Sequence, residues 1–363
     1  MPESSATAPL IRIGLIGFGK MGQTRLAAIN ATGKGRVVLA HDPYATDFQG
    51  LAVAATPEAV YGHPDVEAVF ICTPNHQNKP LAIAAMQAGK HVFCEKPPAF
   101  TAAEVEEIRA VEQATGRKLM YGFNHRHHES IRTIKRMVDS GQYGRLLWMR
   151  GRYGKSVDHN YFGTWRAKKE LAGGGILLDQ GIHMLDLFLL LAGEFDEVQG
   201  MVSSLFWKLE GIEDNVFVNL RNRQTGVVAS LHSTMTQWRH MFSIEVFLER
   251  GYLVLNGLKT SSGSYGDEVL TIAKNRSVAP AATWEDEEKT TFHLDNSWFD
   301  ETDYFLNCVR DDLPVASGNS GDALKVMRLI DTVYQEERHH RDDLHDRLQA
   351  SEVKHADSAT PTP

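Results

Sequence analysis

Several features that would place a chain in a special class are scarce in this sequence. Its 363 residues include three cysteines, Cys72, Cys94 and Cys308, which are too few and too scattered for a disulfide framework or a zinc knuckle. No segment approaches the roughly 18 consecutive apolar residues of a membrane-spanning helix. The first ten residues lack the basic start and apolar core of a secretory signal. These gaps predict a cytoplasmic protein with reduced thiols and no membrane partner.

Positive charge is not concentrated anywhere in the chain. Lys and Arg number 38 against 46 Asp and Glu, which gives a formal net charge of −8. A mildly acidic surface is repelled by phosphate backbones, so we expect no nucleic-acid partner. The remaining composition, with 42% hydrophobic and 23% charged residues, is that of an ordinary globular protein. The length favours two domains over one.

Short apolar segments alternate with helical patterns in the first third of the chain. Thr56 before Pro57, and a reciprocal capping box of Thr101 with Glu104, mark the starts of two of the helices. The apolar segments are continuous rather than alternating, as expected for strands covered on both faces. The alternation predicts an α/β domain with a doubly wound parallel sheet. The expected strands are residues 11–16, 36–41, 67–72, 91–94 and 118–122.

The loop after the first expected strand reads GFGKMG, a glycine pattern that is weak evidence alone but stands here between a strand and a helix. Such a loop presents backbone N–H groups to a pyrophosphate, and Asp42, at the end of the next strand, suits the hydroxyls of an adenosine ribose. A carboxylate there repels a 2′-phosphate, so NAD is favoured over NADP. A glycine turn without a ligand is the weaker alternative. The expected cofactor contacts in the loop are Gly17, Phe18, Gly19, Lys20, Met21 and Gly22.

Polar residues also follow the third and fourth expected strands. Because the carboxyl ends of parallel strands line the ligand crevice of an open α/β sheet, these residues are expected at the cofactor. Lys96 can act there as a positioned charge or proton donor, although an ordinary exposed loop lysine is the alternative. The residues are Thr73, Pro74, Asn75 and His76 after the third strand, and Glu95 and Lys96 after the fourth.

The segment LLDQGIHMLD, residues 177–186, reads as part of a helix with one polar stripe. Asp179, His183 and Asp186 stand at i, i+4 and i+7 and therefore share a face, in surroundings that are otherwise apolar. The stripe is either the solvated face of an amphipathic helix or a functional constellation. The spacing of Asp179 and His183 permits two metal ligands, but no third ligand is evident, so no metal is expected.

Six motifs in order give the chain a family resemblance: GLIGFGKMG, CTPNHQN, CEKPPAF, GFNHRH, TWR and GGGILLDQGIHMLD. The chain resembles, from about Ile11 to Val333, the glucose–fructose oxidoreductase/inositol dehydrogenase/rhizopine catabolism family (Gfo/Idh/MocA) of NAD(P)-dependent oxidoreductases. The resemblance implies a Rossmann domain followed by an α+β domain whose open, mainly antiparallel sheet builds much of an oligomer interface. We expect domains at 8–124 and 125–335, a charged tail at 336–363, and a homodimer or homotetramer formed through the second sheet.

The second part of the sequence fits that description independently. Its β-rich segments, residues 145–153, 199–207, 215–221, 226–234, 241–249 and 252–257, follow one another without the helices of a parallel sheet. Helical patterns over residues 129–141 and 321–335 flank them.

The resemblance also implies roles for individual residues. Lys96, Asp179 and His183 match the family residues that meet at the nicotinamide. His183 suits the role of a base at neutral pH, and Lys96 can stabilise the developing alkoxide, but which of the two accepts the proton stays open. Asp179 would orient His183 or bind a neighbouring hydroxyl. Asp186 is expected to pair with a basic group.

Further residues match family segments that line the cleft. Asn124, Trp165 and Arg166 are expected at the cofactor, while the family usually has an aromatic residue where NHRHH continues after its arginine, which weakens the case for Arg126. The residues expected at the substrate are Arg126, Tyr153, Lys155, His159 and Tyr161.

The expected function is hydride transfer between a sugar ring hydroxyl, or the corresponding ketone, and NAD. Resemblance to members of sugar-nucleotide pathways favours a small-molecule substrate of the UDP-hexosamine type. The alternatives are a free inositol or sugar, and a non-catalytic sensor of sugar or NAD.

Overall fold

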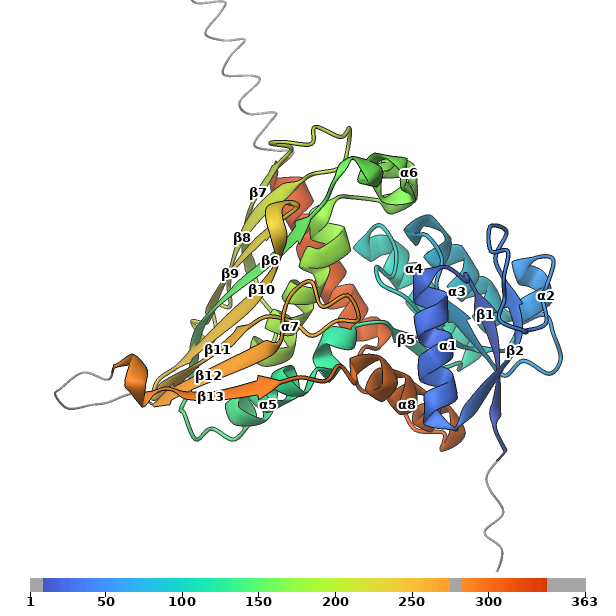
Figure 1. The fold of residues 1–363 in the computed structure, drawn as a ribbon, viewed down its shortest axis with the longest axis horizontal. Helices are drawn as coiled ribbons and strands as arrows, with labels where there is room; N and C mark the ends of the chain where they lie inside the picture. Colours follow the sequence, from blue (N-terminus) through green and yellow to red (C-terminus); the bar gives the residue numbers. More distant parts are fainter. Residues whose placement is uncertain (1–8, 275–282, 338–363) are drawn as a thin grey trace, which may run out of the picture.

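A parallel sheet forms the N-terminal unit. The computed structural model describes residues 9–274 and 283–337, and its first sheet has five parallel strands in the order β2-β1-β3-β4-β5 (Figure 1). The α-helices that connect these strands are α1 (Lys20–Thr32), α2 (Pro57–Tyr61), α3 (Asn78–Gln87) and α4 (Ala102–Thr115). The strands are β1 (Ile11–Ile16), β2 (Gly35–His41), β3 (Ala68–Ile71), β4 (His91–Cys94) and β5 (Leu119–Tyr121).

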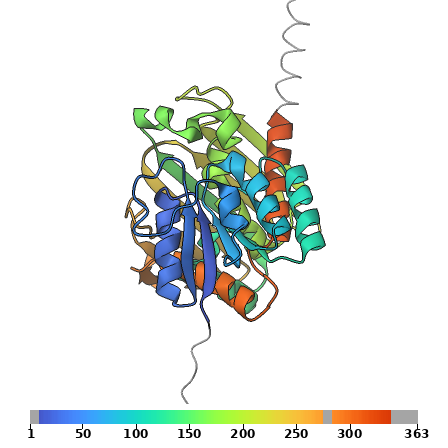
Figure 2. The same ribbon diagram turned by 90° about the vertical axis from the view of Figure 1, so that its right-hand side faces the viewer.

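Successive residues of β3 enter two different cores, which shows that helices cover both faces of the sheet. Phe70 lies in the cluster formed with α1, whereas Val69 and Ile71 lie in the cluster formed with α3 and α4. This arrangement confirms the doubly wound α/β domain, and Figure 2 shows the sheet with helices on either side.

The expected helix starts are confirmed in α2 and α4, with one difference of detail. Thr56 and Thr101 each accept a hydrogen bond from the backbone N–H three residues on. The Glu104 carboxylate, however, accepts from the N–H of Phe100 at 2.8 Å rather than from that of Thr101. The predicted reciprocal capping box is therefore wrong in its second half, because the side chain reaches one residue further back.

The second unit is built on a sheet of eight strands in the order β13-β12-β11-β10-β6-β9-β8-β7. Every neighbouring pair is antiparallel except β6 and β9, which confirms the mainly antiparallel sheet. Strands β12 and β13 were not predicted, and β7 ends four residues before the predicted end at residue 207. The strands are β6 (Leu146–Ser156), β7 (Glu197–Ser203), β8 (Asn215–Arg221), β9 (Val228–Thr234), β10 (Thr236–Leu248), β11 (Gly251–Asn256), β12 (Glu268–Lys274) and β13 (Glu288–Phe292).

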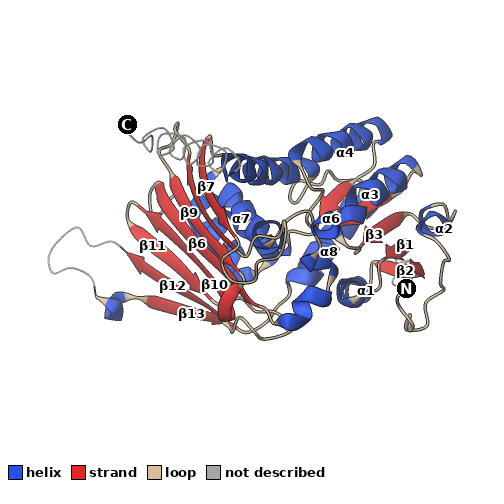
Figure 3. Cartoon of the chain, turned by 90° about the horizontal axis from the view of Figure 1, so that it is seen from above, coloured by secondary structure: helices blue, strands red, loops and turns tan. Residues whose placement is uncertain are grey.

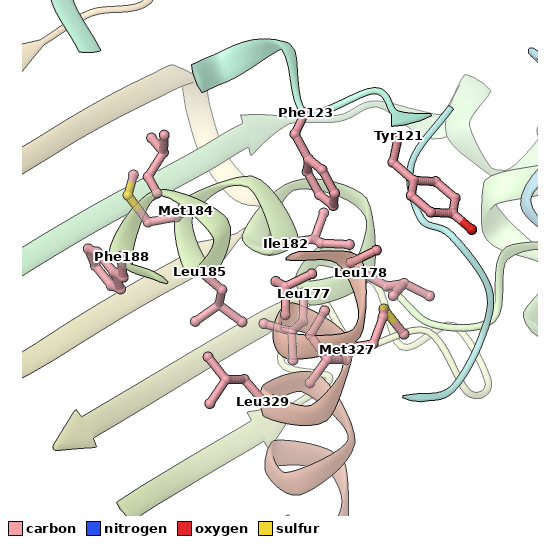
Figure 4. Close-up of a cluster of buried hydrophobic side chains, with 14 of the residues drawn as sticks. Tyr121, Phe123, Leu177, Leu178, Ile182, Met184, Leu185, Phe188, Met327 and Leu329 are labelled. Carbon is pink, nitrogen blue, oxygen red and sulfur yellow. The ribbon is translucent and has the colours of Figure 1, made fainter. Parts of the chain in front are cut away.

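Helices cover only the face of this sheet that is turned toward the parallel sheet (Figure 3). They are α5 (Glu129–Asp139), α7 (Ile182–Ala192) and the helix over residues 320–337. The side chains of Ile182 and Leu185 on α7 and of Met327 on the last of these helices belong to one buried hydrophobic cluster (Figure 4). In the described part of the chain no α-helix covers the opposite face.

The chain returns to the first unit near its end. Helix α8 (Ser297–Arg310) packs on α1, and the Phe305 ring stands edge-on to Phe70 and Phe93 with ring centroids 5.6 Å apart in each pair. The N-terminal core thus contains residues from far outside the first 124. Of the expected tail at 336–363, all residues after 337 lie outside the described part, as do residues 1–8.

The helical stretch Lys169–Ala192 is long and apolar enough to cross a membrane by length and composition. Inside the protein, however, 72% of its apolar window is buried, as in the core helix of a folded domain. Residues 177–186 are helical as predicted, but the first half is a π-helical turn, Leu177–Gly181, that runs directly into α7. Such turns often occur at functional sites.

Candidate active site

The three glycines of the first loop have three different structural settings. Gly17 has φ 91°, and a Cβ atom there would lie 2.5 Å from the carbonyl oxygen of Cys72. A Cβ atom at Gly22 would lie 2.1 Å from the carbonyl oxygen of Gly17, so this glycine lets α1 approach the strand. At Gly19 a Cβ atom would meet no atom within 4 Å. The loop therefore keeps open space over the backbone at the start of α1.

The N-terminus of α1 faces that space. Gly19 caps the helix without a side-chain hydrogen bond, and Lys20 and Met21 form its first positions. Phe18 is buried with its ring 5.2 Å from that of Phe48. Helix N–H groups over open space suit a pyrophosphate, and the loop therefore fits the expected dinucleotide.

Asp42 is fixed beside the loop by backbone groups. One carboxylate oxygen accepts from the N–H of Phe18 at 2.7 Å, and the other from the N–H groups of Tyr44 and Ala45 at 2.8 and 3.2 Å. The side chain thus joins the end of β2 to the glycine loop. Its negative charge lies where a ribose bearing a 2′-phosphate would be repelled.

The residues after β3 connect the two units. Asn75 donates to the carbonyl oxygen of Ala172 at 2.8 Å, and the Thr73 hydroxyl donates to Asn78 at 3.2 Å. Pro74 precedes this short helical turn. His76 is partly exposed, but its buried Nδ1 has no partner among the described residues.

Glu95 pairs with a buried arginine. Its carboxylate accepts from Arg25 Nε at 2.7 Å, and Arg25, which is fully buried, also binds Glu301 at 2.6 Å. Burial raises the pKa of Glu301 to about 7 against the opposing effect of Arg25. Glu95 therefore anchors the turn that carries Lys96. No sequence motif indicated its buried partner Arg25.

Three cations converge on the carboxylate of Asp179. Lys155 Nζ lies 3.2 Å from Oδ2, and Lys96 Nζ and Arg166 Nε lie 3.4 and 3.6 Å from Oδ1. Lys96 also donates to the Asp179 carbonyl oxygen at 2.5 Å. The π turn presents both the carbonyl and the carboxylate of this residue to Lys96, so residues predicted from three separate motifs meet here.

The charges of this cluster shift one another's protonation. Burial would raise the pKa of Asp179, but Lys155, Lys96 and Arg166 together hold it well below its usual range. Burial lowers the pKa of Lys96, and Arg166 and Lys155 lower it further against the effect of Asp179. Three cations around one carboxylate leave an excess of positive charge, which favours an anionic oxygen beside them.

His183 lies one turn further along α7 and is 4% exposed. Burial, and then the charge of Lys96, lower the pKa of its imidazole well below the usual value, which makes the neutral ring the stable form at pH 7. Its Nδ1 atom is buried without a partner among the described residues. Together with Asp186, which is fully buried, this burial shows that the alternative of a solvated helix face is wrong.

Asp186 pairs with a basic group as predicted, and that group is Arg126. Two guanidinium nitrogens of Arg126 bind the two oxygens of Asp186 at 2.5 and 2.7 Å, while a third binds Asp322 at 2.7 Å. Arg126 is therefore engaged by carboxylates within the protein rather than extended toward a substrate.

Other expected residues border the cluster in different ways. Asn124 is buried and bonds to Ser297 and His125, so both ends of its amide are engaged within the protein. The Arg166 guanidinium lies over the Trp165 ring, 4.3 Å from its centroid. The Tyr161 hydroxyl donates to the Arg166 carbonyl oxygen at 3.2 Å.

Tyr153 and His159 have aromatic neighbours. The Tyr153 ring is buried with its hydroxyl 3.0 Å from His125 Nε2. His159 is exposed and lies against the rings of Phe162 and Trp207 instead of the Asp179 cluster. His125, whose ring stacks on that of His183, was not among the predicted site residues.

Comparison with known proteins assigns the class of this fold and site. Residues 11–123 match the model of the oxidoreductase family with an NAD-binding Rossmann fold, and residues 131–254 match the C-terminal domain of the same GFO/IDH/MocA family. The chain belongs to this family of oxidoreductases.

Two similar proteins carry the names of carbohydrate enzymes. The chain is 31% identical over 281 residues to 1,5-anhydro-D-fructose reductase of Ensifer adhaerens, covering 74% of this chain and 82% of the relative. It is 38% identical over 151 residues to levoglucosan dehydrogenase of Pseudarthrobacter phenanthrenivorans, a match that spans 40% of this chain and only 38% of that enzyme. A solved structure of a levoglucosan dehydrogenase in complex with NADH superimposes with a TM-score of 0.80 at 22% identity, over 91% of this chain and 98% of that one.

Proposed function

We propose that the protein is an NAD-dependent dehydrogenase that oxidises a ring hydroxyl of a free sugar or cyclitol, or reduces the corresponding ketone. The observation that carries the proposal is the meeting of Lys96, Asp179 and His183 between the two units. Bound NAD would supply the carbon that accepts the hydride. The residues of the chain have to hold the alcohol and remove its proton.

We assign the proton to His183 because its ring is neutral and can accept it, while Lys96 is held against Asp179 by two contacts. Lys96 then donates a hydrogen bond to the substrate oxygen as negative charge develops on it. Asp179 keeps Lys96, Lys155 and Arg166 around that oxygen. Dependence of the pH profile on Lys96 but not on His183 would reverse the two roles.

A free sugar is preferred to the nucleotide-linked sugar that the sequence motifs favoured. The three described cations at the site all face Asp179, which leaves none of them dedicated to a diphosphate. The two curated relatives are named for levoglucosan and 1,5-anhydro-D-fructose, and neither name contains a nucleotide. NAD is preferred to NADP because the Asp42 carboxylate borders the ribose position.

We further propose that a second copy covers the open face of the large sheet. Met201, Phe217 and Val228 on three adjacent strands are 61%, 42% and 39% exposed there. Exposed apolar side chains on a broad sheet face are typical of a subunit interface. A homodimer or homotetramer would bury it. We expect the enzyme in the cytoplasm, where its three free thiols stay reduced.

The decisive experiment is NADH formation by purified protein with a panel of free sugars, anhydrosugars, inositols and UDP-hexosamines. We expect signal from a free carbohydrate, with NAD preferred over NADP, and no signal from the Lys96→Met variant. Activity confined to UDP-sugars would overturn the substrate class. Failure of every substrate in both directions, with NAD bound normally, would indicate the non-catalytic sensor instead.

A further inference from the structure

His125 lies face to face with His183, although no motif drew attention to it. The two ring centroids are 3.9 Å apart and the ring planes differ by 14°, so the imidazoles are stacked. Both side chains are buried, at 5% and 4% exposure. His125 comes from the short helical segment Asn124–His127 after β5, whereas His183 is on α7 in the other unit.

Both nitrogens of His125 are engaged, and the direction of each hydrogen bond is fixed by its neighbours. Asp295 can only accept, so the Ser297 hydroxyl donates to it at 2.6 Å. Ser297 must then accept from the amide NH₂ of Asn124 at 3.1 Å, which turns the amide oxygen toward His125.

The next bonds follow from this orientation. The Asn124 oxygen accepts from Nδ1–H of His125 at 3.1 Å, and Nε2 therefore accepts the Tyr153 hydroxyl proton at 3.0 Å. His125 is thus held as one neutral tautomer by a directed chain from Tyr153 to Asp295. A ring with both nitrogens occupied in this way does not compete for the substrate proton.

His183 has no such chain. Its Nδ1 has no partner among the described residues, in contrast to a catalytic histidine oriented by a carboxylate or carbonyl. The His183 ring is instead stacked on the flat ring of His125. A neutral aromatic face also tolerates the positive charge that His183 would acquire as it takes a proton.

We propose that His125 is the positioning residue of His183, whose orientation depends on the aromatic face of His125 and not on a hydrogen bond. This inference rests on the function proposed above and deepens it, since it names the support of the proton acceptor. The side-chain hydrogen bonds of His125 go to Asn124 and Tyr153, so its contact with the proposed proton acceptor is the stacking of the two rings.

The charged and titratable groups around His183 come from each element packed against it. They are Lys96 from the turn after β4, Asp179 from the π turn, His125 and His128 from the segment after β5, and Tyr153 from β6.

Two variants separate the ring of His125 from its hydrogen bonds. His125→Phe keeps an aromatic face but leaves the Tyr153 hydroxyl and the Asn124 oxygen without their hydrogen-bond partner, so this variant should unfold at a lower temperature. His125→Gln keeps polar partners but removes the face. We expect kcat to fall at most about threefold in the Phe variant and about tenfold or more in the Gln variant, because a displaced base loses its alignment. Both variants should bind NAD as the unmodified protein does.

The pKa of His183, followed by NMR of its imidazole resonances, gives a readout that needs no turnover. In His125→Gln water reaches the exposed ring, so its pKa should rise toward the ordinary value, whereas in His125→Phe it should stay low. An unchanged pKa in both variants, with kcat falling in step with thermal stability, would overturn the inference. A rise only in the Gln variant, in a protein that turns over no substrate, would support the positioning role while refuting the proposed dehydrogenase.

Discussion

Arg126 and Asp186 form a buried two-point ion pair, with donor–acceptor distances of 2.5 and 2.7 Å, that joins the segment after β5 to the middle of α7. The same arginine reaches Asp322 at 2.7 Å on the last helix. Three elements from distant parts of the sequence are thereby joined at one guanidinium, and one of them is α7, the helix that carries His183.

Removing one partner of this pair should weaken the fold strongly. Asp186→Asn leaves the buried cation only partly compensated by Asp322, so we expect the free energy of unfolding to fall by about 3 kcal/mol, as for other broken buried pairs. Urea denaturation measures it. Glu129→Gln, which breaks an exposed pair with Arg136, is the control and should cost under about 1 kcal/mol. Equal losses in both variants would contradict the importance of the buried pair.

Substitution of the proposed alkoxide-stabilising lysine should separate binding from chemistry. Lys96→Met should lower kcat by about 10²-fold or more, because the developing charge loses its hydrogen-bond donor, while the Kd for NAD stays nearly constant. Fluorescence titration with NADH and steady-state kinetics test both. Lys325→Met, at an exposed ion pair with Glu194, is the matched control and should change neither quantity. Retained turnover in Lys96→Met would refute the assignment.

The glycine loop allows a test with two single-methyl variants. In Gly19→Ala the added methyl enters open space, so stability should change by no more than about 0.5 kcal/mol. NAD binding should nevertheless weaken about tenfold, since the methyl occupies the expected path of the pyrophosphate. In Gly22→Ala the methyl meets the Gly17 carbonyl at 2.1 Å, so the fold itself should lose about 1–3 kcal/mol. Calorimetry of unfolding and of NAD binding distinguishes the two; full NAD affinity in Gly19→Ala would place the cofactor elsewhere.

His127 should make stability depend on pH below neutrality. Burial, followed by the charges of Arg132 and Arg126, lowers its pKa to about 3, and Arg132 donates a hydrogen bond to its Nδ1. Between pH 6.5 and about 3 the unfolded chain binds a proton that the folded chain does not, so this stabilising contribution is complete above 6.5 and declines as pH falls. In His127→Gln the slope of unfolding free energy against pH should decrease by up to about 1.4 kcal/mol per pH unit. Urea unfolding from pH 4.5 to 7.5 measures the slope. An unchanged slope in His127→Gln would contradict this prediction.

Charge on the open sheet face should prevent self-association. The unmodified chain of 40.5 kDa is expected to elute as a dimer or tetramer, and the double variant Met201→Glu/Phe217→Glu as a folded monomer, because paired carboxylates cannot be buried against a second copy. Light scattering gives the mass. Leu313→Glu, at an exposed loop residue, is the control. A monomeric unmodified protein would refute the proposed interface.

The sequence predicted what depends on local pattern. All five parallel strands were found because each is a continuous apolar run, and the glycine loop and the strand-end residues follow from that register. The edge strand β13 escaped prediction because most of its side chains are exposed and no apolar alternation marks it. The stacking of His125 on His183 and the burial of Arg25 depend on how distant elements pack, which no spacing within one segment records.

The position of α8 has a consequence for engineering and for the evolution of such enzymes. Two apolar side chains of this helix, Phe305 and Leu306, complete the core on one face of the parallel sheet. A chimera that takes its first 124 residues from one homologue and the rest from another would therefore pair a sheet with a foreign helix. Recombination between relatives should succeed only when residues 297–310 and the N-terminal segment come from the same parent. The part of the chain that has to be exchanged together is therefore discontinuous in sequence.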